Sequence, residues 1–471
     1  MTRPWLAGAL ICGLCCLAAP LGAQPRPPRD GVPKLGSGKA SAAPKTTPAC
    51  AAARSALDIG AATIAAGLGR VPDGTRVVSS ALKSDAPAPR AADLTAKLAE
   101  LVAGRLGAGV TFEPAPFTLD EARTKAAALP GFVWLQPKIA AGRLHLSADA
   151  YPVPRTVWAR ARALRPGPIA HAFAQARIDA EVRSYLQPIP FVDPKVAKFE
   201  GADPDILALA CGDLDGDGGS DLVTMTRQRI LQVRLADGKV SRVREAQWSE
   251  LAAVAPVPLR QPLGFATIVE ASSSTEPSGY LDVALSDRAG SVRLDPDFSV
   301  VRKMKGYAVP SGRSTACTWI VDLLLGDKLT PCADHDPPPD LPQLEHRSDA
   351  IAADVLVARD GSHQPLFALR RNTGLVVRGP KGDMVIGRVG AQLAIGDVDQ
   401  DGAADLVSTL DVLSRKHDVV ELRSLLPSGT VKRRFKLPVP TGVDAVAICP
   451  PDGPGRAPIV LASQSQLWVL R

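Results

Sequence analysis

Two copies of one acidic loop constrain the fold of this chain more than any other part of its sequence. The first is CGDLDGDGGSDLV, at residues 211–223, and the second is AIGDVDQDGAADLV, at residues 394–407. Both have the spacing Asp-x-Asp-x-Asp-Gly-x-x-Asp, and in both an apolar segment precedes the loop and another follows it. Short apolar segments on either side of an Asp/Gly-rich turn are typical of two β-strands joined by a hairpin. The sequence therefore predicts the same strand–loop–strand unit at two places.

Each loop places four aspartates within nine residues. Their negative charges repel one another, and any burial opposes ionisation further. A divalent cation between the carboxylates would remove this repulsion, and Ca²⁺ suits such a loop because it accepts about six to eight oxygen ligands in irregular geometry. We therefore predict two calcium sites, each completed by one backbone carbonyl. The predicted ligands are Asp213, Asp215, Asp217, the Gly219 carbonyl and Asp221 in the first loop, and Asp397, Asp399, Asp401, the Ala403 carbonyl and Asp405 in the second.

Two other interpretations of these loops are less favoured by the sequence. An EF-hand begins with the same spacing, but it needs a glutamate at its twelfth position and a helix on each side. That position holds Thr224 in the first loop and Ser408 in the second, and strands are predicted on both sides. An Asp-Gly turn that binds nothing would leave four charged groups without compensation. Calcium binding is therefore the preferred interpretation.

Weaker copies of the same unit follow the first loop. Segments at Asp282, Asp354 and Pro458 align with Asp221 and keep its following strand, but they lack the acidic set and are predicted to hold no metal. Repeats of about 50 to 60 residues with about four strands each are typical of propeller blades. We predict a mainly β fold, with a β-propeller of about five to seven blades at residues 190–471. The terminal WVLR strand is expected to close the ring against residues near 190–200.

The acidic loop resembles the FG-GAP or VCBS-type repeat of exported bacterial propellers and of the integrin α-chain head. In that family, the Asp-x-Asp-x-Asp-Gly-x-x-Asp loop lies between two strands of a blade and binds calcium. The resemblance covers about residues 190–471 and is specific at the two acidic loops. The Phe-Gly and Gly-Ala-Pro signatures that give the repeat its name are absent. The resemblance implies a propeller stabilised by calcium.

A small α+β domain is predicted before the propeller, at residues 50–186. Leucines recur at helical spacing from Ala91 to Gly107, and Thr118 and Glu121 form a capping box at the start of another helix. Two strands are expected at 132–139 and 143–150. The outline is similar to the helix-and-strand domain of TolB-like envelope proteins, without a shared motif.

The N-terminus has the features of an export signal. Residues 1–23 combine Arg3, an apolar stretch and small residues before Gln24, and residues 24–49 form a Pro/Gly/Ser/Lys-rich linker. We expect an exported protein that is periplasmic, on the cell surface or secreted. An uncleaved anchor is the alternative, so membrane association is expected only through the N-terminus.

The cysteines beyond the signal suggest one disulfide. Cys317 and Cys332 are close enough to staple a loop, and Cys332 lies in a Pro-rich insertion, 328–352, that takes the place of an acidic loop. Cys211 and Cys449 are expected to be small buried hydrophobic residues, because they lie in apolar, strand-like segments.

The sequence favours binding over catalysis. It lacks the Gly-x-Ser-x-Gly, His-Glu-x-x-His and phosphate-binding Gly-Lys-Ser/Thr motifs. Its net charge of +7 is modest for 471 residues, and the arginines around Trp158 are interpreted as a solvated strand face, so no nucleic-acid partner is expected. We predict a non-catalytic binding or scaffold protein that contacts a protein or glycan at the bacterial envelope. The alternatives are a propeller glycosidase or polysaccharide lyase, and a spacer propeller whose N-terminal domain contacts an envelope complex.

Overall fold

The structure of the protein is a computed structural model. It describes residues 55–471 apart from some gaps, and the predicted signal and linker lie outside the described residues. The gaps are 155, 163–165, 188–190, 192, 218, 256–261, 270–277, 313, 322–323, 335, 337, 342, 358–362, 373, 380–381, 427 and 452–455.

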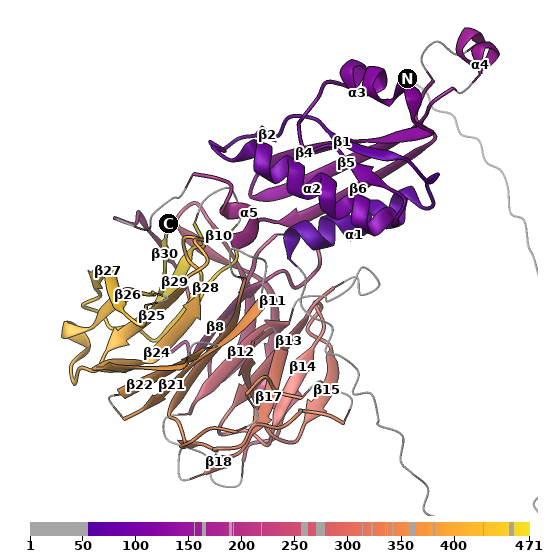
Figure 1. The fold of residues 1–471 in the computed structure, drawn as a ribbon. Helices are drawn as coiled ribbons and strands as arrows, with labels where there is room; N and C mark the ends of the chain where they lie inside the picture. Colours follow the sequence, from indigo (N-terminus) through magenta and orange to yellow (C-terminus); the bar gives the residue numbers. More distant parts are fainter. Residues whose placement is uncertain are drawn as a thin grey trace, which may run out of the picture. The chain divides into compact units, whose positions relative to one another are not determined.

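The first part of the described chain is an α+β unit built on one sheet (Figure 1). The strand order is β3-β1-β4-β5-β6, with β2 paired to β4; β1 runs parallel to β3 and β4, whereas β4, β5 and β6 are antiparallel. The elements are α1 (Ala56–Leu68), β1 (Arg76–Ser79), β2 (Lys83–Ser84), α2 (Ala91–Leu106), β3 (Thr111–Phe112), α3 (Leu119–Lys125), a 3-10 turn η1 (Ala126–Ala128), β4 (Gly131–Ala140), β5 (Arg143–Pro152), α4 (Val157–Arg162), β6 (Ala170–Arg177) and α5 (Ala180–Arg183).

Local sequence signals account for several of these elements. Helix α2 begins at Ala91 and ends before Gly107, and its leucine stripe packs into the core with α1. The predicted capping box is present, because the Glu121 carboxylate accepts the Thr118 backbone N–H at 2.7 Å and the Thr118 hydroxyl accepts the Glu121 N–H. One prediction was wrong: Trp158 lies in helix α4 and not on a strand, and it is exposed. The alternating arginines misled the strand assignment.

The remaining chain is a β-propeller of six blades, within the predicted range of five to seven. The first strands of the blades, β8, β12, β16, β20, β24 and β28, contact one another in sequence, and β28 contacts β8, so the ring closes. The strands are β7 (Val196–Glu200), β8 (Ala208–Gly212), β9 (Asp221–Met225), β10 (Arg229–Ala236), β11 (Lys239–Gln247), β12 (Gly264–Val269), β13 (Tyr280–Leu285), β14 (Ser291–Leu294), β15 (Val300–Met304), β16 (Tyr307–Ser311), β17 (Ser314–Thr318), β18 (Ile320–Val321), β19 (Leu324–Leu325), β20 (Ala350–Val357), β21 (His363–Arg371), β22 (Gly374–Gly379), β23 (Gly382–Gly387), β24 (Val389–Gly396), β25 (Ala404–Leu410), β26 (Val419–Leu425), β27 (Val431–Pro438), β28 (Ala445–Ile448), β29 (Ile459–Ser463) and β30 (Gln466–Leu470). Two short helical elements complete this part: α6 (Trp248–Leu251) and a 3-10 turn η2 (Arg415–His417).

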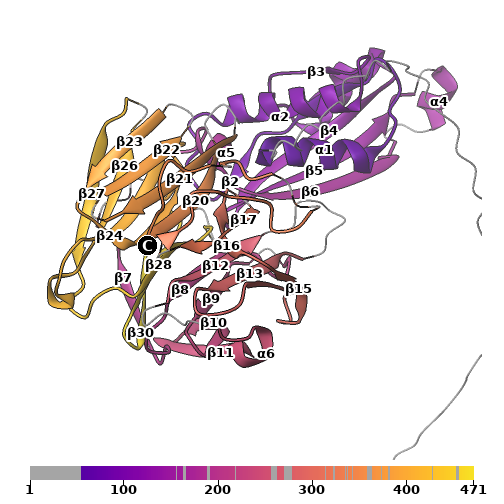
Figure 2. The ribbon, with the colours of Figure 1, turned by 90° about the horizontal axis from the view of Figure 1, so that it is seen from below.

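The last blade is built from both ends of the propeller. Strands β28, β29 and β30 come from the C-terminus, and β7, at the start of the propeller, pairs antiparallel with β30 as the outer strand. The predicted closure is therefore confirmed. Because a paired terminal strand leaves its hydrogen-bonding edge covered, this arrangement holds the ring shut. Figure 2 shows the same strands from below.

Two disulfides are present among the described residues. Cys317–Cys332 is the predicted pair, and it ties β17 to the Pro-rich insertion. The second pair, Cys211–Cys449, was not predicted: these residues are disulfide-bonded and not simple buried hydrophobic residues. They are 238 positions apart in sequence, but ring closure places the end of β8 beside the end of β28, with the two Cα atoms 4.9 Å apart.

The sequence alignment of the weak copies was wrong at one position. Asp354 lies on β20, the first strand of its blade, whereas Asp221, Asp282 and Asp405 lie on second strands. The insertion hides the missing unit, because its Thr330 bridges to Cys317 and completes the blade that begins with β16. Six blades are therefore present where five copies align in the sequence.

The two disulfides should contribute unequally to stability. In the chain-entropy model, a bond that closes a loop of 238 residues contributes on the order of 5 kcal/mol, and one that closes 15 residues contributes about 3 kcal/mol. Replacing Cys211 and Cys449 together by alanine should therefore lower the free energy of unfolding more than replacing Cys317 and Cys332. Denaturant titration of both double variants measures the difference. An equal or smaller loss for the Cys211/Cys449 variant would contradict the role assigned to this bond.

Candidate metal centre

The two acidic loops occupy equivalent places in the propeller. Each connects the first and second strands of its blade: β8 to β9 in the first blade, and β24 to β25 in the fifth. The strand registers match as well, because Gly212 pairs with Asp221 and Gly396 pairs with Asp405. The last aspartate of each motif is thus fixed at the start of a paired strand, which sets its position relative to the loop.

Three of the five predicted ligands come together in each loop. Carboxylate oxygens of each triad lie within 4.8 Å of one another, which is close enough to share one cation. The triads are Asp213, Asp215 and Asp221 in the first loop, and Asp397, Asp399 and Asp405 in the second.

The other predicted ligands have different contacts. The Asp217 carboxylate accepts the Gly219 N–H, and the Asp401 carboxylate accepts the Ala403 N–H at 2.8 Å, so both shape the turn of their loop. The Gly219 carbonyl accepts a hydrogen bond from Arg177 at 2.7 Å.

Backbone N–H groups hold the triads in place. Asp221 accepts the Leu214 N–H at 2.9 Å, and Asp405 accepts the equivalent Val398 N–H at 3.0 Å. Asp397 accepts two N–H groups, from Asp401 and Gly402, at 3.0 and 2.9 Å. The bond to the last aspartate thus recurs in both loops, whereas the N–H of the third aspartate bonds to Asp215 in the first loop and to Asp397 in the second.

The second loop is the more strongly perturbed. Burial raises the pKa of Asp405 to about 7 and raises the pKa of Asp397 well above its ordinary value, and neighbouring carboxylates add to both shifts. Burial also raises the pKa of Asp399, whose Oδ1 has no hydrogen-bond partner within the described residues. Buried, crowded carboxylates of this kind favour either protonation or a bound cation.

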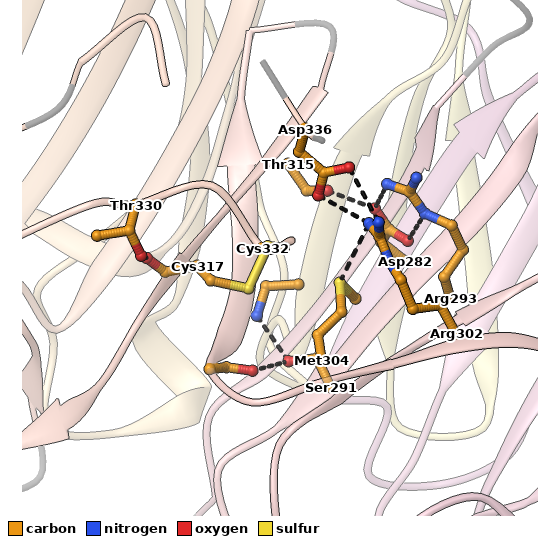
Figure 3. Close-up of a disulfide and its surroundings, with 12 residues drawn as sticks. Asp282, Ser291, Arg293, Arg302, Met304, Thr315, Cys317, Thr330, Cys332 and Asp336 are labelled. Atoms are coloured by element: carbon orange, nitrogen blue, oxygen red, sulfur yellow. Dashed lines mark hydrogen bonds and ion pairs between the residues drawn. A yellow bond between two sulfur atoms is a disulfide. The ribbon is translucent and has the colours of Figure 1, made fainter. Parts of the chain in front are cut away.

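The second blade shows how the fold neutralises the same aspartate without a metal (Figure 3). Asp282 is fully buried on β13, and Arg293 of β14 donates two hydrogen bonds to its carboxylate, at 2.7 and 2.6 Å. In the two blades with acidic loops, the third strand again supplies the partner of this aspartate, but the partner is neutral. Gln232 of β10 donates to Asp221 at 2.7 Å, and Ser424 of β26 donates to Asp405. The anchoring aspartate is therefore paired with an arginine in the second blade and with a neutral donor in the acidic-loop blades, where the nearest arginines lie beside other aspartates: Arg177 is 3.5 Å from Asp213 and Arg434 is 3.6 Å from Asp399. Sequence reasoning missed Arg293, although its position opposite Asp282 was a usable signal.

The loop of the last blade lies between the two acidic loops. The Ser220 hydroxyl donates to the Pro450 carbonyl at 3.2 Å, and the Ala457 N–H donates to the Val398 carbonyl at 2.8 Å. The Cys211–Cys449 bond joins the same region. Both triads therefore flank the place where the ring closes.

Comparison with known proteins gives limited information. No protein-family model and no curated protein matches the sequence. Among solved structures, the chain is similar to AofleA from Arthrobotrys oligospora, at 9% identity over 59% of this chain and 86% of that one, with a TM-score of 0.36. It is also similar to TolB from Acinetobacter baumannii, at 11% identity over 85% and 95% with a TM-score of 0.29, and to a glucose dehydrogenase, at 12% over 59% and 99% with a TM-score of 0.33. At such scores these likenesses carry no argument, so the propeller assignment rests on the strand order.

The length and hydropathy of the helices bear on whether the chain could cross a membrane. No helix in the described residues is long and apolar enough to cross a bilayer.

The raised pKa of Asp405 predicts how the calcium-free protein responds to pH. Its folded pKa of about 7 exceeds the ordinary value of about 3.9, so the folded state prefers the protonated form. Its contribution to stability is fully present below about pH 4 and is lost as the pH rises toward 7. In chelator, wild type should therefore lose stability from pH 5 to pH 8 relative to Asp405→Asn, which cannot titrate. Denaturant unfolding at both pH values tests this, and a difference that does not change with pH would contradict it.

Proposed function

We propose that this protein is an exported, calcium-stabilised β-propeller of the FG-GAP/VCBS type that acts as a non-catalytic binding or scaffold module at the bacterial envelope. One observation carries the proposal. Two carboxylate triads lie at the same place in two blades, and their anchoring aspartates have neutral partners, whereas the anchor of the second blade is paired with an arginine. A calcium ion in each triad would supply the positive charge that Arg293 supplies there.

The role of the calcium follows from the position of the triads. Both flank the loop of the last blade, where β7 and β30 close the ring. An ion bound there would fix the end of a first strand to the start of a second strand in two blades beside the closure. Calcium is therefore proposed to stabilise the ring and not to take part in chemistry.

Export is supported by two features of different kinds. The N-terminal sequence has the pattern of a signal peptide. The described residues hold two disulfides, and such bonds persist mainly in oxidising compartments such as the periplasm or the cell exterior.

The ligand is proposed to bind on the face opposite the acidic loops. Strand β25 leaves the second acidic loop and ends at a polar hollow of about 250 Å³. Its lining includes Arg370, Gln392, Asp411 and Arg415, together with the fully exposed Leu413. Its guanidinium, carboxyl and amide groups can donate and accept hydrogen bonds with the polar groups of a protein or glycan.

The same hollow gives the enzymatic alternative its one supporting observation. Asp411 and Asp418 both line it, and burial raises the pKa of Asp418. Many glycosidases use two carboxyl groups as acid and base, one of them with a raised pKa. The Asp418 carboxylate, however, accepts the N–H groups of Val419 and Val443, at 2.8 and 2.9 Å, which ties it to the backbone. The binding module therefore ranks first.

The calcium proposal predicts a specific response of Asp399→Asn. This change removes one buried charge of the second triad and preserves its shape. Wild type should gain thermal stability when calcium is added after chelation, and the variant should lose most of that gain. Asp237→Asn is the matched control, because Asp237 lies in an ordinary hairpin turn between β10 and β11 and should respond like wild type. Calorimetric titration and thermal melting measure both effects, and a wild-type melting temperature that ignores calcium and chelator would refute the proposal.

A panel of polysaccharides separates the two functions. If the protein is a non-catalytic binding module, no glycan of the panel should be cleaved and no reducing ends should be released. A hydrolase predicts release that Asp411→Asn abolishes. Turnover that depends on Asp411 would overturn the non-catalytic proposal in favour of the alternative.

A further inference from the structure

Both acidic loops contact the same short segment of the α+β unit. This segment runs from the end of β6 to α5. Arg177 donates a hydrogen bond to the Gly219 carbonyl at 2.7 Å and lies 3.5 Å from the Asp213 carboxylate. Arg183 donates two hydrogen bonds to the Gln400 side chain, at 2.9 and 2.7 Å. Two arginines six residues apart thus reach one acidic loop each.

The contact at the second loop leaves the metal ligands accessible to a cation. Arg183 and Gln400 are both buried, and Gln400 also donates to the Ile178 carbonyl at 3.2 Å. These bonds use a side chain that belongs to neither the triad nor the predicted carbonyl ligand. Asp399 is more than nine-tenths buried, and its Oδ1 has no hydrogen-bond partner in the described residues, so this oxygen is left for an ion, whereas its Oδ2 lies 3.6 Å from the Arg434 guanidinium. Docking of the α+β unit and cation binding can therefore coexist at this loop.

The contact at the first loop is different because Arg177 contacts two of the predicted calcium ligands directly. The Arg177 guanidinium bonds to the Gly219 carbonyl and faces Asp213, and both groups belong to the predicted calcium set. A calcium ion bound to this carbonyl and this carboxylate would place two positive charges within a few ångströms of each other. The guanidinium acts here as a cation supplied by the chain itself.

We propose that calcium and Arg177 compete for the first acidic loop, so that calcium binding there releases the Arg177 contact between the propeller and the α+β unit. At the second loop, Arg183 is bonded to Gln400, which is not a predicted ligand, so calcium binding there keeps this contact. The proposal rests on the calcium sites proposed above and adds their regulation. At low calcium, both Arg177 and Arg183 contact the acidic loops, whereas at high calcium the Arg183 contact remains and the Arg177 contact is lost. The first site is accordingly the weaker of the two and the one that responds to calcium concentration.

The test uses the full mature chain with two readouts. In calcium titrations, Arg177→Met should tighten the weaker site about tenfold, which is the effect of losing one charge-assisted hydrogen bond that the ion must displace. Arg143→Met is the matched control, because Arg143 pairs with Arg177 across β5 and β6 and does not contact either loop through any recorded bond among the described residues. Asp215→Asn identifies the weaker site by abolishing it.

The second readout is the reactivity of the arginine side chains toward phenylglyoxal, located by peptide mass spectrometry. Calcium should raise modification of Arg177, whose side chain is 22% exposed, and leave that of the buried Arg183 unchanged. Melting curves in chelator check that Arg177→Met is folded, and Arg177→Lys provides a second variant that keeps the charge and should keep most of the competition. Calcium binding at both loops with unchanged Arg177 reactivity and unchanged affinity in Arg177→Met would overturn this proposal and leave the calcium sites standing. Absence of calcium binding at either loop would overturn both.

Discussion

The pairing of β7 with β30 is the interaction on which the rest of this structure depends. Each blade buries its faces only against its neighbours, so an open ring would expose the first and last blades along their whole length. Adding a strand from the start of the propeller to the final blade makes the two ends of the chain parts of one sheet. The Cys211–Cys449 bond lies at the same seam and joins the first blade to the last. The acidic loops flank this seam as well, so three different kinds of interaction meet where the ring would otherwise open.

The buried aspartates at the start of the second strands are each compensated in one of a few ways. A buried carboxylate must be neutralised by a proton, a basic side chain or a cation. Asp282 has Arg293, and its loop carries no further aspartates that need compensation. Asp405 has Ser424 and lies with two more carboxylates, of which Asp399 is 3.6 Å from Arg434, so three carboxylates share one nearby arginine in the triad. The difference between these blades is therefore one of charge balance within an otherwise common hairpin.

Local signals in the sequence predicted local structure well. The Thr118 capping box, the leucine stripe from Ala91 and the acidic hairpins all depend on contacts within a few residues, and all three are present. The pairing of the C-terminal strand with the start of the propeller was the one contact between distant segments that was predicted, and others were missed. Cys211 resembles any small apolar residue until ring closure brings Cys449 beside it, and the insertion around Thr330 hides a blade because its strands are reduced to isolated bridges. Asp354 was misplaced for the same reason, since repeat spacing alone does not distinguish a first strand from a second.

The two acidic loops also differ at one position in a way that spacing alone does not explain. The residue after the second aspartate has a positive φ in both loops: 79° at Gly216 and 55° at Gln400. Glycine adopts this conformation freely, whereas glutamine there costs about 1 kcal/mol or more. A residue kept at a strained position needs a compensating contact, and the Gln400 side chain bonds to both Arg183 and the Ile178 carbonyl. The second loop therefore combines an ion-binding geometry with a docking side chain, whereas at the first loop the backbone carbonyl of Gly219 receives the arginine. The exchange of glycine for glutamine at this position therefore accounts for the different way in which each loop contacts the α+β unit.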